Sequence, residues 1–346
     1  MSTRYTAGLH NVGSYQVSGQ PWVKNHSFAG VESKFYEFPN VTDHIKITND
    51  IGAVGNDVNI VFCEPRRGLQ LAPAGVNVSN NFQGGGLDLS DFTISLWIKM
   101  IDLEPTKFFE LESSAGNPFR FQIHNTTSPQ TRLFVDGNHT TETSLPFVAG
   151  EYYNIVGTFS SGNSNIYVNG QLHQSSAVTY TDKITNLILG SIATNGFDGV
   201  YEQVIIFDRA LSEEEVASVY AADEIVKSLS SNLKDSIVSR YEFEDNTYKN
   251  FFAVADTTTT IQDRVGNVNL TRSGSNTAFF VDGKKIEIAL ERHNITLVGQ
   301  QEILLSCKSK QIFLRSTGNT EVNISAGLTG ISAQHMYDLT GPGIDE

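Results

Sequence analysis

The stretch GVYEQVIIFDRALSEEEVASVY, residues 199–220, decides the fold because it passes from a strand pattern into a helix pattern. Its first part, EQVIIFD, is rich in β-branched and aromatic residues and predicts a strand. In the second part Ser212 is placed as an N-cap, and Glu215 three residues later completes a capping box. Glu213 and Glu214 then fall in the first helical turn, where the helix dipole favours negative charge by about 0.3–1 kcal/mol each. The carboxylates therefore mark a strand-to-helix junction rather than a catalytic cluster.

Most other periodic segments alternate with a period of two, as half-buried strands do. Examples are FTISLWIKM (residues 92–100), FRFQIHN (119–125) and AFFVDGKKIEIAL (278–290). The dipeptide Asn169-Gly170 predicts a hairpin turn between two such segments. A second helical pattern covers residues 223–237, where apolar residues lie four apart. We therefore predict an all-β fold of antiparallel sandwiches with one or two short helices.

The turn residues and strand patterns also suggest how the chain is divided. Gly, Pro, Asn and Ser cluster in RRGLQLAPAGVNVSNNFQGGG, residues 66–86, and predict an irregular linker. Residues 20–70 and 275–346 carry short strand patterns that need partners, so we predict that they form one discontinuous β-sandwich. Residues 84–272 would form a domain inserted into it, and residues 1–20 an N-terminal arm.

Five segments within residues 84–222 follow one another in a fixed order. They are GLDLSDFTISLWIK, EYYNIVGTF, IYVNGQL, LILGS and FDGVYEQVIIFDRALSEEEV. In this order and spacing they resemble the laminin G-like, concanavalin A-like jelly roll. The resemblance implies two curved antiparallel sheets, with Trp97 in the core and Asn169-Gly170 at a two-residue turn. We therefore expect a concanavalin A-like jelly-roll sandwich inserted into the second, discontinuous β-sandwich.

Two later segments resemble elements that open this family's domain. VSRYEFEDN (residues 238–246) is similar to its first strand, and IQDRVGNVNLT (261–271) to its Asp-x-x-Gly-Asn turn. In the family these elements precede the FTISLWIK strand, whereas here they follow the helix. We therefore predict a circularly permuted domain in which residues 238–272 return to complete the sheets.

The composition argues against several classes of partner. Acidic residues outnumber basic ones by 38 to 24, and the formal net charge is −14, so we expect no nucleic-acid partner. No long apolar run occurs, and the first residues lack the pattern of a signal peptide, so we expect neither membrane insertion nor a cleaved signal. Cys63 and Cys307 lack zinc-type spacing and are expected to be buried thiols, with a bridge between them left open.

The sequence offers two candidate positions for carboxylate chemistry. Glycosidases on related jelly rolls share a strand motif of alternating acids; Glu242 with Glu244 is the nearest match here, but the third acid is missing. Some members of the resembled family bind calcium near a final-strand Asp-Glu pair, which here is Glu202-Gln203, so one carboxylate is absent. We expect no enzymatic activity and no cofactor, with Glu202 as the one candidate ligand for Ca²⁺.

Loop side chains provide a candidate carbohydrate site. Jelly rolls often bind sugars through loop aromatics and Asn or Asp side chains, because such sites combine apolar walls with a few placed polar groups. The residues that match this description are Phe119, His124, Asn125, His139, Tyr180 and Asn195. The alternative, that they are loop and core residues of a scaffold, stays open.

The two ends of the chain suggest a biological setting. SYQVSGQPWVKN (residues 14–25) and LTGISAQHMYDLTGPGID (328–345) resemble the ends of virion structural proteins from tailed phages. The resemblance implies a capsid decoration, vertex, tail or fibre component that is assembled in the host cytoplasm and located in the virion. Its partners would be other proteins of the capsid or tail lattice, further copies in a homo-oligomer, and a host-surface glycan. A carbohydrate-binding adhesin outside a virion and a glycan hydrolase remain the alternatives.

Overall fold

The computed structural model places most of its described secondary structure in antiparallel strands. It describes residues 20–50, 55–62, 67–71, 77–81, 91–103, 107–113, 119–123, 131–135, 138–142, 147–160, 162–178, 184–190, 197–223, 228–243, 260–261, 265, 269–273, 278–292 and 294–335. The contacts divide the chain into two compact units: unit 1 is Met1–Arg66, Asn246–Phe252 and Lys285–Glu346, and unit 2 is Arg67–Asp245 and Ala253–Lys284. In sequence, unit 2 is therefore inserted into unit 1.

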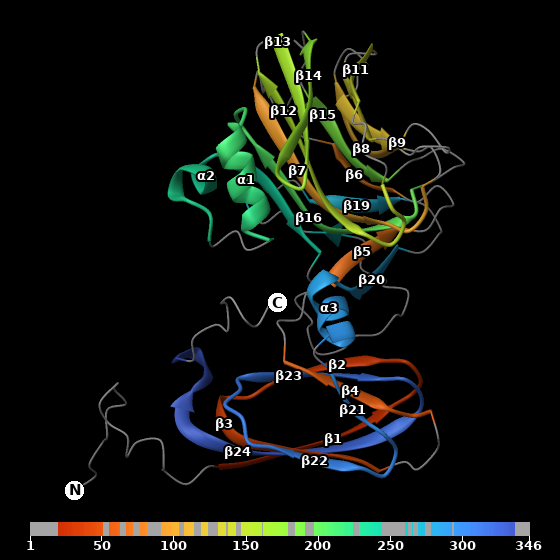
Figure 1. The fold of residues 1–346 in the computed structure, drawn as a ribbon, viewed down its shortest axis with the longest axis vertical. Coiled ribbons are helices and arrows are strands. Elements are labelled where there is room, and N and C mark those ends of the chain that lie inside the picture. The colour runs from red at the N-terminus through yellow and green to blue at the C-terminus, as the bar shows by residue number, and fades with distance from the viewer. Residues whose placement is uncertain are drawn as a thin grey trace, which may run out of the picture. The chain divides into compact units, whose positions relative to one another are not determined.

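Unit 1 is a sandwich of two four-stranded antiparallel sheets, with the orders β1-β24-β3-β22 and β2-β23-β4-β21 (Figure 1). Its strands are β1 (Gln20–Phe28), β2 (Ser33–Glu37), β3 (Asn40–Asn49), β4 (Val58–Val61), β21 (Ile295–Leu297), β22 (Glu302–Leu305), β23 (Gln311–Ser316) and β24 (Thr320–Ser332). Alternate side chains, such as Ile45 and Ile47 of β3, are fully buried between the sheets. Both sheets combine strands from before and after unit 2, which confirms the predicted discontinuous β-sandwich.

Cys307 packs half-buried against the core of unit 1, and this burial raises the pKa of its thiol. The expectation of a buried thiol therefore holds only partly at this position. Cys63 lies outside the described residues, so a bridge between the two stays an open prediction.

The segment AFFVDGKKIEIAL was expected to form a strand. In the structure it is not one strand. Only β20 (Ala278–Asp282) is a strand, and the helix α3 (Lys284–Arg292) follows it. The helix packs its apolar residues against the outer side of the β2-β23-β4 strands, where the contacting residues are Phe35, Val61, Ile286, Ala289, Leu290 and Phe313. The apolar residues of KKIEIAL fit strand alternation as well as a helical spacing of three and four, and their packing on unit 1 favours the helix.

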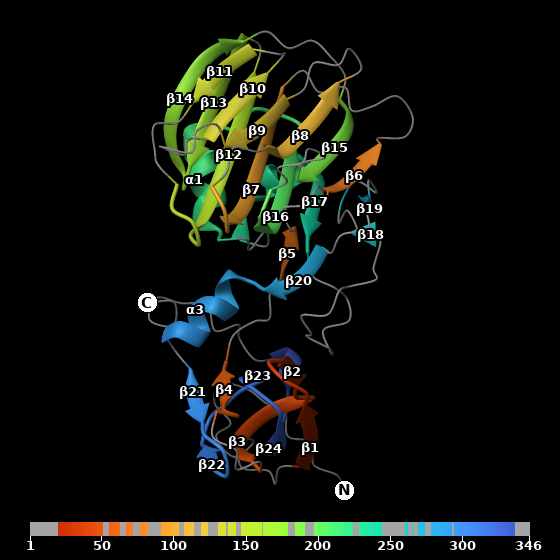
Figure 2. The same ribbon diagram turned by 90° about the vertical axis from the view of Figure 1, so that its right-hand side faces the viewer.

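Unit 2 is a sandwich of two eight-stranded antiparallel sheets (Figure 2). Sheet I has the order β14-β13-β12-β7-β16-β5-β20, with β17 also pairing with β16, and sheet II has the order β11-β10-β9-β8-β15-β6-β19-β18. The strands are β5 (Arg67–Leu71), β6 (Asn77–Asn81), β7 (Phe92–Met100), β8 (Lys107–Ser113), β9 (Phe119–Ile123), β10 (Thr131–Val135), β11 (Asn138–Glu142), β12 (Tyr152–Ser160), β13 (Gly162–Val168), β14 (Gln171–Val178), β15 (Ile184–Gly190), β16 (Gly199–Phe207), β17 (Ile237–Glu242), β18 (Thr260–Ile261) and β19 (Leu270–Ser273). Large apolar side chains such as Phe92, Leu96 and Leu187 fill the space between the sheets. The predicted all-β jelly-roll fold class is confirmed.

The Asn169-Gly170 turn is where the sequence predicted it, between β13 and β14. Both residues have positive φ values, 50° and 77°, as a type I′ hairpin turn requires. Val168 and Gln171 are the last register partners before the turn. This local prediction is confirmed.

The stretch of residues 66–86 is not an irregular linker, so that prediction was wrong. It contains β5, which pairs with β16 and β20, and β6, which pairs with β15 and β19. A Cβ on Gly68 would collide with the side chain of Val200, so the close approach of β5 to β16 requires this glycine. The glycine that suggested a linker instead permits a strand, whose partners lie far along the chain.

Strands from late in the sequence complete both sheets of unit 2. β17 pairs with β16, β20 with β5, and β19 with β6. The permutation hypothesis expected such contacts between the strand around Tyr241 and the central sandwich. Tyr241 is fully buried in the cluster between the sheets.

The outer face of sheet I is covered by two short helices, α1 (Glu213–Ala221) and α2 (Ser231–Asp235) (Figure 1). The predicted helix over residues 223–237 is shorter than expected, because Ile237 already begins β17. Leu229, Leu233 and Ile237 are nonetheless all buried against this face, so their spacing of four predicted their burial correctly. In the described part of the chain, no helix is long and apolar enough to cross a membrane.

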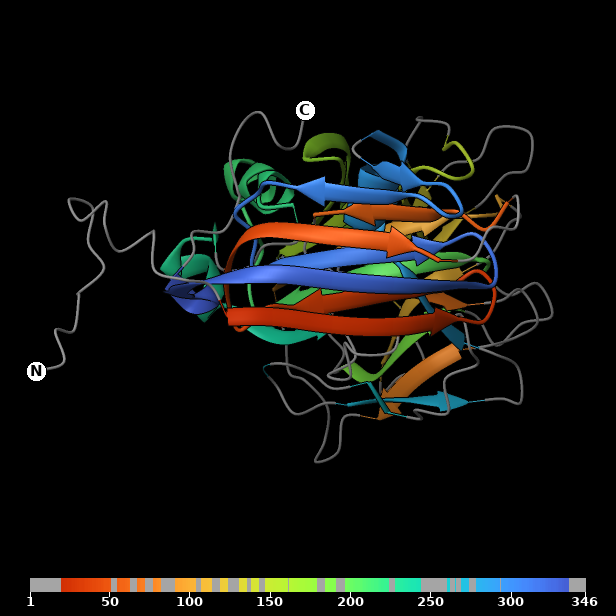
Figure 3. The same cartoon turned by 90° about the horizontal axis from the view of Figure 1, so that it is seen from below.

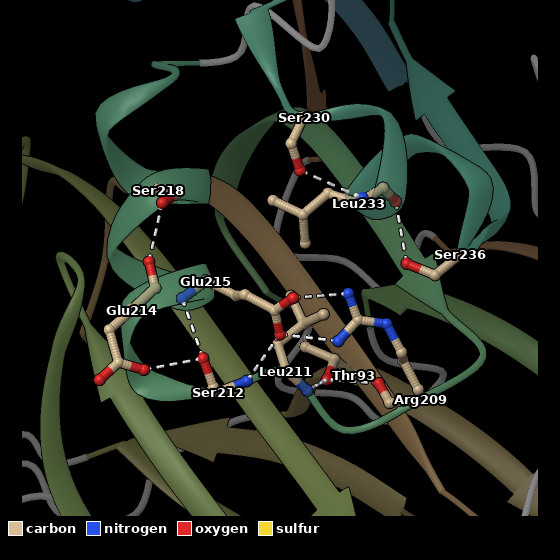
Figure 4. A network of polar contacts seen from close by, with 10 residues as sticks. All are labelled: Thr93, Arg209, Leu211, Ser212, Glu214, Glu215, Ser218, Ser230, Leu233 and Ser236. Carbon is tan, nitrogen blue, oxygen red and sulfur yellow. Dashed lines mark hydrogen bonds and ion pairs between the residues drawn. The ribbon is translucent and has the colours of Figure 1, made fainter.

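The carboxylates that open α1 form the predicted capping box (Figure 4). The Ser212 hydroxyl accepts a hydrogen bond from the amide of Glu215, whose carboxylate accepts one from the amide of Ser212. Both carboxylate oxygens of Glu215 also bind the Arg209 guanidinium at 2.7 Å, and this contact lowers the pKa of Glu215. The cluster therefore anchors the helix at the end of β16.

Replacing the N-cap, Ser212→Ala, is expected to lower the free energy of unfolding of unit 2 by about 1 kcal/mol, because the first-turn amide loses its acceptor. Urea denaturation followed by circular dichroism measures the change. The matched control is Ser218→Ala on the same helix, whose hydroxyl donates to the carbonyl of Glu214 within the helix. Equal losses for the two variants would contradict the capping role.

Candidate functional site

The chain crosses between sheets I and II five times at one end of unit 2. The crossings join β5 to β6, β7 to β8, β11 to β12, β15 to β16 and β19 to β20. In sheet I, Gly199 is the register partner of both Leu71 and Met100, and in sheet II, Asn77 is the partner of both Gly190 and Ser273. We call this end of unit 2 the loop end. Connections that gather at one end of a rigid sandwich are a common position for binding residues.

Backbone hydrogen bonds hold three of these crossings together. The amides of Ile101 and Asp102 donate to the carbonyl of Asp198 at 3.0 and 3.3 Å. The amide of Gly150 donates to the carbonyl of Met100 at 2.7 Å. The crossings after β7, before β12 and before β16 are therefore fixed relative to one another.

Asp198 is the polar centre of the described part of the loop end. Burial raises the pKa of its carboxyl, a hydrogen bond from Gln70 lowers it, and the negative charge of Asp102 raises it further. Its Oδ1 atom is buried and makes no hydrogen bond to a described residue. A buried carboxylate oxygen without a donor is costly, so a donor that reaches this oxygen would stabilise it.

Two apolar side chains at the loop end are unusually open to solvent. Ile101 is 37% exposed and Val148 is 56% exposed. The crossing that carries Val148 is held by its amide, which donates to the Tyr153 hydroxyl at 2.9 Å, and by the edge-to-face contact of Phe147 with Tyr153. A carboxylate and exposed apolar side chains at the same end of the sandwich suit the two kinds of group that a sugar offers, hydroxyl donors and C–H groups.

The raised pKa of Asp198 has a consequence for stability. Because the folded state holds this proton more tightly than the unfolded state, unit 2 should lose stability as the pH rises from 3.8 through the raised pKa. Asp198→Asn should remove this loss, and urea denaturation at a series of pH values measures it. Asp208→Asn is the matched control, since Asp208 is exposed just beyond the other end of β16. Retention of the full pH dependence in Asp198→Asn would contradict the assignment.

Three of the predicted carbohydrate residues follow strands that end at the loop end. His124, Asn125 and Asn195 themselves lie outside the described residues. β9 precedes the first two and β15 precedes the third, and both strands end there, since Gln122 pairs with Lys107 and Gly190 with Asn77. Their role in carbohydrate binding stays a prediction.

Of the other three predicted carbohydrate residues, Phe119 and His139 lie in described strands away from the loop end. The register places Phe119 opposite Leu111, which is fully buried in the core, and His139 opposite Phe134. Tyr180 lies outside the described residues and follows β14, whose last residue pairs with Gly162 at the opposite end. Whether the six residues form one carbohydrate site stays a prediction.

Glu202 lies in a bulge of β16, because Tyr201 pairs with Ile98 while Gln203 pairs with Trp97. The side chain is 5% exposed, and its Oε1 accepts a hydrogen bond from the backbone amide of Lys284. Among the described residues, no three His, Cys, Asp or Glu side chains gather in a way that could hold a metal ion. Glu202 contributes to the fold through this contact, and its role as a Ca²⁺ ligand stays a prediction.

The resemblance implied that Trp97 lies in the core between the sheets. Trp97 is buried, but it does not lie in that core. Its neighbours Leu96 and Ile98 belong to that core, so the alternation of β7 turns Trp97 to the outer face. There its ring stacks on Tyr220 of α1, with centroids 5.7 Å apart, and the Lys284 ammonium lies 4.0 Å from its centroid. The same ammonium forms an ion pair of 2.7 Å with Asp223. Trp97 therefore fastens the helix and the returning chain to sheet I.

The candidate glycosidase pair is only partly described. Glu242 ends β17 and lies 3.5 Å from the Arg240 guanidinium, while Glu244 lies outside the described residues. No sequence pattern pointed to Asp102 or Ile101, because their place at the loop end depends on where the chain crosses between the sheets. Asp198 stands directly before the final strand, in the motif FDG, and could have been proposed from that position.

Residues 74–217 match the Laminin_G_3 family model, described as the concanavalin A-like lectin/glucanases superfamily. The match lies within unit 2 and covers less than half of the chain. This stretch is therefore a laminin G-like, concanavalin A-like domain. No curated protein matches the chain.

Several solved structures are similar to the chain at low sequence identity. A putative carbohydrate-binding protein from Bacteroides ovatus is 13% identical with a TM-score of 0.48, covering 78% of this chain and 94% of that one. The heptameric SAP-like pentraxin from Limulus polyphemus is 15% identical with a TM-score of 0.39, covering 49% and 84%. Trypanosoma rangeli sialidase is 15% identical with a TM-score of 0.36, and the match spans 52% of this chain and 33% of the sialidase. Likenesses this distant carry no argument about activity.

Proposed function

We propose that the chain binds a glycan through the loop end of unit 2 and presents this site as a structural component of a virion. The observation that carries the binding site is the buried Asp198 Oδ1, which has no hydrogen-bond partner among the described residues and lies at the end of unit 2 that also carries exposed apolar side chains. The lectin-type family match of residues 74–217 supports the same reading. The ligand is then a host-surface glycan.

The chemistry of the loop end suits a neutral sugar hydroxyl. An ionised Asp198 accepts hydrogen bonds, and a hydrogen bond to a charged group contributes about 1.5–3 kcal/mol. Ile101 and Val148 can cover the C–H face of the ring, since both are exposed. A single site of this kind binds weakly, and many copies on one particle would supply the avidity that adhesion needs.

The test compares the full chain and two variants on a glycan array, followed by calorimetric titration of any sugar that binds. Asp198→Asn is expected to weaken binding by at least about tenfold, while Asp208→Asn at the opposite end of β16 should change it by less than about twofold. Because an asparagine side chain has nearly the shape of the aspartate it replaces, unit 2 should stay folded, which circular dichroism verifies. Binding that survives Asp198→Asn would move the site elsewhere on unit 2.

The virion setting rests on a different support, the resemblance of the two chain ends to virion structural proteins of tailed phages. In this proposal unit 1 attaches to a capsid or tail lattice, as a decoration, vertex, tail or fibre component, and neighbouring copies form a homo-oligomer. Mass spectrometry of purified particles from the source tests the setting. Absence of the chain from particles would leave a carbohydrate-binding adhesin outside a virion.

A glycan hydrolase is the remaining alternative, since the matching superfamily is described as including glucanases. Glu242 and Glu244 would then serve as the carboxylate pair. Release of reducing sugar from a bound glycan, abolished in Glu242→Gln, would establish the enzyme. Binding without release favours the adhesive role.

A further inference from the structure

The strand β1 forms one edge of a sheet of unit 1 (Figure 3). All nine of its residues pair with β24 on one side. On its other side, no strand of the described residues pairs with it. Val23 on its outer face is 66% exposed. An edge strand of this length offers a row of backbone donors and acceptors to a further strand.

Basic and aromatic side chains line the side of the sandwich where β1 meets β2. We call this lining the β1–β2 seam, and its residues are Trp22, Lys24, His26, Lys34 and Tyr36. Trp22 and His26 of β1 lie 6.1 and 6.3 Å from the Tyr36 ring of β2, measured between ring centroids. The Tyr36 hydroxyl is buried and has no hydrogen-bond partner among the described residues. The seam thus holds one buried hydroxyl without a hydrogen-bond partner among the described residues.

The charges at the seam repel one another. The pKa of Lys34 is lowered by burial and then by the charge of Lys24, while Glu32 opposes both effects. The pKa of His26 is lowered by burial and by Lys34 and Lys24, again opposed by Glu32. One carboxylate oxygen of Glu32 accepts a hydrogen bond from the amide of Ala29 and so also stabilises the turn between the strands. A local positive region therefore exists on a chain whose formal net charge is −14.

We propose that β1 binds an extended acidic peptide segment of a partner protein, which adds to the sheet as a further strand. Side chains alternate along a strand, so its acidic residues would face the seam and lie beside Lys24 and Lys34. Its apolar residues would then lie on the other face, beside Val23. This partner site is independent of the glycan site on unit 2.

The seam favours an acidic strand over other strands and over a simple anion. Lysines on an edge strand discourage pairing with neutral or basic strands, which is a common protection against aggregation. A phosphate-type anion would be attracted by the lysines but would leave the backbone groups of β1 and the exposed Val23 unused. An acidic strand can pair with the backbone groups of β1, place its carboxylates near the lysines and cover Val23.

The test titrates the full chain with a synthetic nine-residue peptide that alternates glutamate with valine, matching the nine residues of β1. Calorimetry measures affinity, and hydrogen exchange measures protection of the β1 amides. The double variant Lys24→Glu, Lys34→Glu should weaken binding by at least about tenfold, and the single variant Lys24→Gln, at an exposed position, should weaken it less while remaining folded.

The control variant is Lys46→Glu, which makes one of the same Lys-to-Glu replacements on β3 and breaks a surface ion pair with Glu302. It should alter peptide affinity by less than about twofold. A peptide of the same composition with its glutamates in one block should bind more weakly, and the NMR-measured pKa of His26 should rise when the alternating peptide binds. Three results would each overturn the proposal: no binding by the unmodified chain, an equal loss in Lys46→Glu, or equally tight binding of linear polyphosphate without protection of the β1 amides.

Discussion

Gly199→Ala should lower the free energy of unfolding of unit 2 by about 3 kcal/mol. A Cβ at this position would lie 2.5 Å from the carbonyl oxygen of Lys99 and still closer to the Phe197 ring. The carbonyl belongs to the central strand β7, so it cannot move away without disturbing sheet I. Urea denaturation in a Trp22→Phe background measures the loss, because Trp97 is then the only tryptophan.

The comparison variant is Gly330→Ala on β24 of unit 1, where a Cβ would meet nothing within 4 Å, and its unfolding is followed by circular dichroism. This change should shift stability by less than about 0.5 kcal/mol. A loss in Gly199→Ala no larger than in the control would show that β7 and β16 do not approach as closely at Lys99 as the structure places them. The close approach also fixes the crossing before β16, so the same variant should weaken glycan binding.

Trp97→Ala should destabilise unit 2 by about 3–5 kcal/mol, the usual range for truncating a buried aromatic side chain. The ring is 3% exposed and contacts both Tyr220 and the Lys284 ammonium. Its removal leaves a cavity beneath α1 and takes the aromatic face away from a partly buried cation. Differential scanning calorimetry measures the loss, since the variant lacks the tryptophan that would report on unit 2.

Tyr220→Ala separates the stacking contact from the rest of this arrangement. Tyr220 is 38% exposed, so its truncation should cost clearly less than that of Trp97. A loss below about 1 kcal/mol in Trp97→Ala would contradict the view that this ring fastens α1 and Lys284 to sheet I.

Local patterns predicted the parts of the fold that depend on near neighbours in the sequence. The capping box of Ser212 and Glu215 and the type I′ turn at Asn169-Gly170 are complete within a few residues, and both were predicted correctly. The strand β5 could not be predicted in this way, because its partners β16 and β20 lie far along the chain. The helix α3 was misassigned because KKIEIAL fits both a strand and a helix pattern, and packing decides between them.

The candidate site shows the same division. Sequence reasoning pointed to loop residues, and three of them, His124, Asn125 and Asn195, follow strands that end at the loop end. It missed Asp198, whose importance comes from burial and from the nearby charge of Asp102, two effects that only the folded chain creates. It also placed Trp97 in the core, since the resemblance fixed that residue's burial but not the face of β7 from which it projects.

The central claim is that Asp198 at the loop end of unit 2 binds a glycan. The most direct measurement is calorimetric titration of the full chain and of Asp198→Asn with a sugar identified on a glycan array. The account predicts binding by the unmodified chain and at least about a tenfold weaker affinity in a folded Asp198→Asn variant, with Asp208→Asn unchanged within about twofold. Equal affinities of the unmodified chain and Asp198→Asn for the same sugar would contradict it.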